Sequence, residues 1–81
     1  MDSDSAFIDL VEYVVKSIVD NPDQVTVTEF DEPGSIMLEV SVAESDMGRV
    51  IGRGGSVVNS IRSLVQVLAA KHGKRVSLEI I

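Results

Sequence analysis

The sequence predicts an α+β fold in which three helices cover one face of a three-stranded mixed sheet. Two long segments show the helical spacing of apolar residues, three show the alternation typical of strands, and a glycine-rich stretch separates a short helical segment from the second long one. Two strands joined by a helical crossover are expected to be parallel, with a right-handed connection. The last strand should therefore lie parallel to the second, beside it or one place away.

The first expected helix covers residues 6–19. Its apolar residues recur every three or four positions, and Tyr13 is expected in the core with its hydroxyl at the edge. Ser3, Asp4 and Ser5 are candidate N-caps, and residues 1–4 are expected to form a flexible N-terminus. The helix should stop before Pro22, because the residue that precedes a proline avoids the helical region.

The next two segments predict a β-hairpin. Residues 25–30 are rich in β-branched residues and alternate, and residues 35–43 alternate between apolar and polar positions. Residues 31–34 between them, Asp-Glu-Pro-Gly, have the composition of a turn. The sheet face that carries Met37, Glu39, Ser41, Ser77 and Glu79 is expected to be largely solvated.

The second half of the chain predicts a short helix at 46–51, a glycine loop at 52–55, a helix at 56–72 and a strand at 75–81. Ser45 is a candidate cap for the short helix, and Gly73 fits a left-handed C-cap of the long one. The loop glycines are costly inside a helix, so they should separate the two helices. The apolar stripe of the long helix is expected to comprise Val57, Ile61, Leu64, Val65 and Leu68.

Composition restricts the class of protein. The 81 residues, 44% hydrophobic and 25% charged, predict one globular domain that spans residues 1–81. The chain contains no cysteine and one histidine, which excludes zinc ribbons and leaves no His-rich metal site. No apolar run approaches the roughly 18 residues of a membrane span, and the acidic N-terminus is unlike a secretory signal. We therefore expect a cytoplasmic protein without a membrane partner.

Charge is divided unevenly along the chain. Residues 1–46 hold twelve acidic residues and one basic residue, whereas residues 47–81 hold six basic residues and one acidic residue, within a net charge of −6. Such asymmetry points to a surface that faces a polyanion. Chance segregation of solvated charge is the alternative reading.

The glycine loop carries the clearest chemical signal. Gly52 and Gly55 let the backbone turn sharply and a ligand approach closely, and Arg53 provides a charged donor. The helix that begins near Ser56 directs its free N–H groups and positive dipole end toward the loop, which suits a phosphate. Ser56 is most simply the cap of this helix, and its hydroxyl is also a candidate phosphate contact. A plain helix–helix turn remains the alternative, whereas the Walker and dinucleotide motifs require other spacings.

The stretch from Val50 to Ile61 resembles the V-I-G-x-x-G-x-x-I-x-x-I signature of the KH domain, with Val58 in place of the first isoleucine after the loop. The element order is similar to that of the prokaryotic type II KH fold, α-β-β-α-α-β. Length, order and motif together resemble the small stand-alone bacterial KH proteins of the KhpA family. The resemblance implies binding of single-stranded RNA or DNA, with about four nucleotides held by their backbone.

The resemblance also implies which residues contact RNA. Gly52, Arg53, Gly54 and Gly55 would hold phosphates, and Arg49 would add charge from the preceding helix. Apolar residues that flank the loop would form the floor for the bases: Val50, Ile51, Val57 and Val58. The strand near Val76 and Leu78 would form the opposite wall. One or two basic residues at the rim are expected to contact RNA, from the set Lys71, Lys74 and Arg75. The loop has a single basic residue where many relatives have two, which should lower affinity.

Two other functions are alternatives to RNA binding. The first is a protein-interaction module, because the apolar segment 76–81 is expected at a sheet edge, and exposed edges invite pairing. The resemblance implies the same, as a homodimer or a heterodimer with a larger Jag-type KH protein. The second, an acidic carrier protein, is disfavoured because such carriers are helical bundles. No group is arranged for catalysis, so we expect neither enzyme activity, a cofactor nor a small-molecule substrate.

Overall fold

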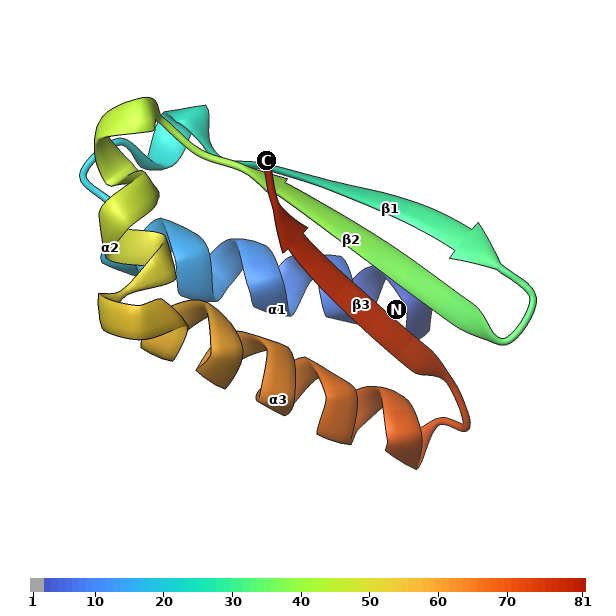
Figure 1. Cartoon of the computed structure of the whole chain (residues 1–81). Coiled ribbons are helices and arrows are strands. Elements are labelled where there is room, and N and C mark those ends of the chain that lie inside the picture. The colour runs from blue at the N-terminus through green and yellow to red at the C-terminus, as the bar shows by residue number, and fades with distance from the viewer. Residues whose placement is uncertain (1–2) are drawn as a thin grey trace.

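The computed structural model describes residues 3–81, with side chains from Phe7 onward. The chain forms α1 (Ser3–Ile18), β1 (Thr26–Glu32), β2 (Ser35–Ser41), α2 (Met47–Ile51), α3 (Ser56–Lys71) and β3 (Arg75–Ile80). The strand order is β1-β2-β3, with β1 antiparallel and β3 parallel to β2. The helices lie on one face of the sheet (Figure 1), so the predicted mixed sheet and the type II KH architecture are confirmed.

The hydrophobic core fills the space between the sheet and the helices. β2 is the central strand, and its alternation buries Ile36, Leu38 and Val40, while Met37 on the opposite face is 37% exposed. The solvated face of the sheet is therefore the one predicted. The other elements contribute the remaining buried apolar residues, among them Phe7, Val11, Val15, Val50, Val58, Ile61, Val65, Ala69, Val76 and Leu78.

The buried stripe of α3 differs from the prediction. Val58, Ile61, Val65 and Ala69 are buried, whereas Leu64 is 61% exposed. Of the other predicted core residues, Val57 is half-buried, Leu68 is 38% exposed and Tyr13 on α1 is 73% exposed. The helix carries two apolar stripes at helical spacing, and the spacing alone does not decide which of them faces the sheet. The small Ala69 belongs to the stripe that packs closely.

Two element boundaries also differ from the prediction. β1 continues through Asp31 and Glu32, because Glu32 still pairs with Ser35, and the hairpin turns on two residues, Pro33 and Gly34. α1 begins at Ser3, so Asp4 and Ser5 lie within the helix and do not cap it. The flexible N-terminus expected at residues 1–4 stays a prediction, and residues 1 and 2 lie outside the described part.

The predicted C-cap of α3 is confirmed. Gly73 has a left-handed φ of +71°, and its N–H donates to the carbonyl of Ala70 over 3.0 Å. The N–H of Lys74 donates to the carbonyl of Ala69 over 2.9 Å, which completes a Schellman motif. This cap turns the chain directly into β3 and brings the start of that strand beside the end of α3.

Candidate nucleic-acid interface

The backbone between α2 and α3 reverses within residues 52–55. α2 ends where the N–H of Gly52 donates to the carbonyl of Gly48 over 2.9 Å, and Gly52 itself has a φ of +76°. A single 3-10 turn follows, in which the N–H of Gly55 donates to the carbonyl of Gly52 over 3.2 Å. α3 begins with the next residue, so the loop projects directly from the N-terminus of a sixteen-residue helix.

The glycines of this loop have different surroundings. A Cβ on Gly52 would lie 2.5 Å from Cγ2 and 2.8 Å from the backbone nitrogen of Val57, so only glycine fits there. A Cβ on Gly54 would meet no heavy atom within 4 Å, which shows that this part of the loop is open. Gly52 therefore closes the loop against α3, whereas Gly54 leaves bare backbone accessible from outside.

The N-terminus of α3 directs partial positive charge at the loop. Gly55 occupies the N-cap position, and no described side chain caps this end, so the prediction that Ser56 is the cap is wrong. Ser56 is the first helical residue, and its hydroxyl lies beside Gly52. The N–H of Ser56 donates to the carbonyl of Arg53, so the positive end of the α3 dipole lies at the loop without a side-chain cap, and the exposed Arg53 adds a full charge.

The predicted apolar floor is divided between core and surface. Val50 is completely buried and Val58 is 8% exposed, so both side chains belong to the hydrophobic core. Ile51 and Val57 are half-buried and pack against that core from either side of the loop. These two side chains are the ones that offer apolar surface next to the glycines.

A basic residue that sequence reasoning missed lies where α3 passes β3. Arg62 donates from Nη2 to the carbonyl of Leu78 over 3.1 Å and from Nη1 to Oδ1 of Asn59 over 2.8 Å. β3 is an edge strand, so the guanidinium bridges α3 to the free edge of the sheet. The available signal was its spacing, because Arg62 follows Gly55 by seven residues, or two helical turns, and so lies on the same helix face.

The seam between α3 and β3 joins the loop to the predicted basic rim. A shallow hollow at its far end is lined by Gln66, Ala70, Lys74, Arg75, Val76 and Ser77. Arg53, Arg62 and the pair Lys74–Arg75 thus lie at the start, middle and end of a seam about 24 Å long, the length of α3. Lys71 is exposed in the last turn of α3.

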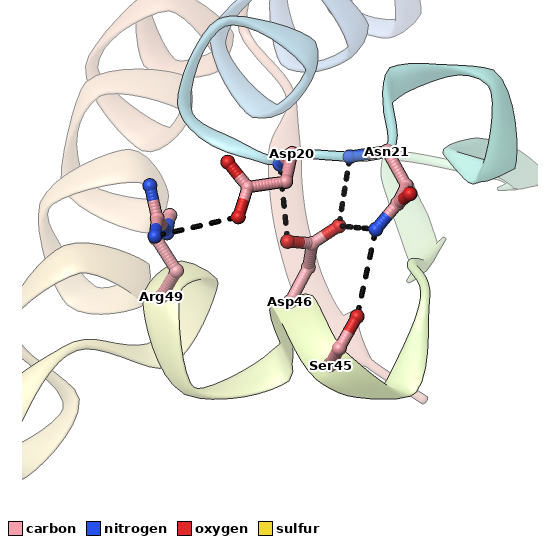
Figure 2. Close-up of polar contacts among 5 residues, drawn as sticks. All are labelled: Asp20, Asn21, Ser45, Asp46 and Arg49. Carbon is pink, nitrogen blue, oxygen red and sulfur yellow. Dashed lines mark hydrogen bonds and ion pairs between the residues drawn. The ribbon is translucent and has the colours of Figure 1, made fainter.

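Arg49 does not extend along the loop. Its Nη2 lies 3.5 Å from Oδ2 of Asp20, so the guanidinium points toward the chain that follows α1 (Figure 2). Both side chains are largely exposed, at 58% and 71%. Arg49 therefore has an intramolecular anion beside it, which the charge pattern of the sequence did not indicate.

A buried carboxylate holds the start of α2. Asp46 is 1% exposed, and its Oδ1 accepts from the N–H of Asp20 over 3.0 Å (Figure 2). Its Oδ2 accepts from the backbone N–H and from Nδ2 of Asn21, each over 3.1 Å. The backbone N–H of Asp20 is the main cause that lowers the pKa of Asp46 below its ordinary value of 3.8, with further lowering by Asn21 and Arg49 against the opposing effect of burial.

The predicted cap of α2 is also corrected by this arrangement. Ser45 lies in a 3-10 turn, Glu44–Asp46, and Asp46 occupies the N-cap position without a capping hydrogen bond. The hydroxyl of Ser45 instead accepts from Nδ2 of Asn21 over 3.5 Å.

Within the described residues, no group of three His, Asp or Glu side chains could hold a metal ion, and no helix is long and apolar enough to cross a membrane.

Comparison with known proteins gives a consistent result. A family model described as KhpA/KhpB, KH domain, matches residues 8–80. The "RNA-binding protein KhpA" of Caldanaerobacter subterraneus is 48% identical over 73 residues, which cover 90% of this chain and 97% of that protein. The protein of the same name from Clostridium acetobutylicum is 47% identical over 89% of this chain and 96% of its own length. The one from Aquifex aeolicus is 39% identical over 95% of this chain and 98% of its own length.

Two of the three loop glycines allow a direct test of the loop geometry. Gly54→Ala should cost about 1–2 kcal/mol of unfolding free energy, because a Cβ is disfavoured at positive φ but has free space there. Gly52→Ala should cost about 1–3 kcal/mol more, because its Cβ also collides with Val57. Urea unfolding of both variants measures the difference, and equal losses would contradict the described packing.

Asp46 should make stability depend on pH in a defined direction. Because its pKa is lowered by folding, the unfolded chain binds the proton first, so the stabilisation is complete above the ordinary value of 3.8 and is lost as pH falls below it. The difference in unfolding free energy between wild type and Asp46→Asn should therefore be constant near neutral pH and shrink in acid. A difference that grows on acidification would contradict this assignment.

Proposed function

The chain belongs to the KhpA/KhpB family of KH-domain proteins, and on this premise we propose that it is a non-enzymatic protein that binds single-stranded RNA through the Gly52–Gly55 loop. The observation that carries the proposal is the loop itself, an open glycine backbone with an arginine at the uncapped N-terminus of a long helix. The names of the similar proteins, "RNA-binding protein KhpA", support the same ligand. The cytoplasmic location stays a prediction from the sequence.

The phosphate backbone is the part of RNA that this loop suits. Free N–H groups at a helix N-terminus and an adjacent guanidinium form a good anion site. Gly54 lets a phosphate approach the backbone without a side chain in the way, and the Ser56 hydroxyl adds a donor. We assign the phosphate contacts to Gly52, Arg53, Gly54, Gly55 and Ser56.

The bases would lie along the seam between α3 and β3. Ile51 and Val57 offer apolar surface beside the loop, and Arg62 places donors two turns further along. Lys74 and Arg75 lie at the far end, where a strand of about four nucleotides would leave the seam. Arg49 joins this surface only if RNA replaces Asp20 as its partner.

The charge distribution favours this seam over the rest of the surface. Residues 47–81, which form α2, the loop, α3 and β3, contain six of the seven basic residues. The acidic residues concentrate in α1 and the β1–β2 hairpin, where RNA would be repelled. Binding is thus expected on one side of the molecule despite the net charge of −6.

The proposal is tested by binding of mixed short single-stranded RNAs at several salt concentrations. With roughly three phosphate contacts, log K against log salt should have a slope of about −2 for wild type. The double variant Arg53→Asp/Gly54→Asp should remain folded by circular dichroism and lose this binding, because two carboxylates replace the phosphate site. Its matched control is Lys16→Glu/Ser17→Glu, which changes net charge equally on an exposed turn of α1.

The control pair should retain most of the wild-type affinity, because its carboxylates lie on α1 and not on the loop, α3 or β3. Binding that is absent from wild type, independent of salt, or equally reduced in both double variants would reject the loop as the RNA site.

A second function, self-association, is favoured by one observation. Tyr13, Leu64 and Val67 are 73%, 61% and 70% exposed on the helical layer, and Leu64 borders an apolar hollow with Leu10 and Val14. The β3 edge is a poorer candidate than expected from the sequence, because Arg62 already occupies the Leu78 carbonyl. We propose this helical face as the contact for a second copy, or for a larger Jag-type KH protein.

Sedimentation over a range of concentrations tests the self-association. Wild type should show a dimer that dissociates on dilution, and Leu64→Ser/Val67→Ser should remain monomeric because apolar contact area is removed. Ile80→Ser on the β3 edge is the control and should dimerise like wild type. A wild type that is monomeric at all concentrations would reject the dimer. If only Ile80→Ser dissociates the dimer, the interface lies at the β3 edge and not on the helical face.

A further inference from the structure

We propose that Asp46 is a positioning residue for RNA binding, which sets the orientation of α2 and thereby the position of the Gly52–Gly55 loop. This inference rests on the proposed function. Asp46 itself is 1% exposed and negatively charged, so it is not a contact for RNA. Its role would be exerted through α2.

α2 is too short to fix its own direction. It has five residues, little more than one turn, and a single-turn helix has almost no stability of its own. Val50 is its one buried residue, and the neighbouring half-buried Ile51 also packs against the core, so both contacts lie at the C-terminal end of α2. These contacts leave the N-terminal end of α2 without a core anchor of its own, so that end needs a second attachment.

Asp46 provides that anchor from the residue that precedes α2. Its carboxylate joins the start of α2 to Asp20 and Asn21, which follow α1 and are 25 or 26 residues earlier in the chain (Figure 2). Three donors converge on the two oxygens at 3.0–3.1 Å. The ion pair between Arg49 and Asp20 lies one turn further along α2 and reinforces the same junction.

A change in the orientation of α2 would move the loop directly. Gly52 continues the hydrogen bonding of α2, through its N–H to the carbonyl of Gly48, and also packs against Val57 at the start of α3. The loop therefore spans two helices, of which α3 is fixed by its long buried stripe. The angle between them depends on the junction at Asp46.

The test uses three variants and compares RNA affinity per folded molecule. Asp46→Asn replaces one acceptor oxygen by an amide donor that faces other donors. Asn21→Ala removes one of the three hydrogen bonds from outside α2 and leaves the sequence of α2 and the loop intact. Ile36→Val is the control, because it weakens the core at the hairpin end of β2, away from α2.

Binding is measured by fluorescence anisotropy with a mixed-sequence single-stranded RNA, and the folded fraction by circular dichroism. We expect an affinity loss of about tenfold for Asp46→Asn and about threefold for Asn21→Ala, in line with one charged hydrogen-bond network broken or weakened. Ile36→Val should lose less than about twofold. NMR should show shifted amide signals of Gly52, Gly54 and Gly55 in the first two variants and not in the control.

The outcomes separate this inference from the proposed function. If wild type binds no RNA, both fail. If wild type binds RNA but Asp46→Asn and Asn21→Ala lose affinity only in proportion to their folded fraction, with unshifted loop glycines, the carboxylate is merely structural and the inference alone is overturned. If Asp46→Asn does not fold, Asn21→Ala carries the same test.

Discussion

The chain reverses between α2 and α3 within four residues, and most features of the candidate site depend on this reversal. The reversal brings the ends of two helices together, and only a residue without a side chain fits at Gly52, where a Cβ would lie 2.5 Å from Val57. The same reversal places the N-terminus of α3 at the loop without a side-chain cap. A packing constraint and the proposed anion site therefore have one origin, and we propose that the buried Asp46 maintains the helix geometry that both need.

The fold was largely predictable because its elements are encoded locally. Alternation in β2 and β3, the Pro33–Gly34 turn and the Gly73 cap each act over a few residues, and the parallel β2–β3 pairing follows from the handedness of crossovers. The orientation of α3 was not predictable, since its two apolar stripes have equal spacing. Which stripe is buried depends on how closely Ala69 and Val65 approach the rest of the core, and that is a property of the assembled protein.

Like the fold, the candidate site was predictable where its features are encoded locally. The loop with Arg53 is contiguous in sequence, so its character is visible there. Arg62 and Asp46 also act through residues 16 to 26 positions away, and the local sequence does not indicate these distant partners. Sequence reasoning accordingly identified the loop that we propose as the phosphate site, but it did not identify Asp46 or Arg62, nor the Asp20 carboxylate beside Arg49.

The parallel pairing of β2 with β3 has a consequence for how the molecule folds. Ser35 pairs with Arg75, forty residues later, and the whole segment that carries the glycine loop forms the crossover between them. Contacts between distant parts of a chain form late, because the intervening segment must first be ordered at an entropic cost. The pairing of β3 with β2 therefore requires that the loop has already turned, so the seam between α3 and β3 forms together with the final strand. Any molecule whose sheet is complete has therefore already reversed its chain between α2 and α3.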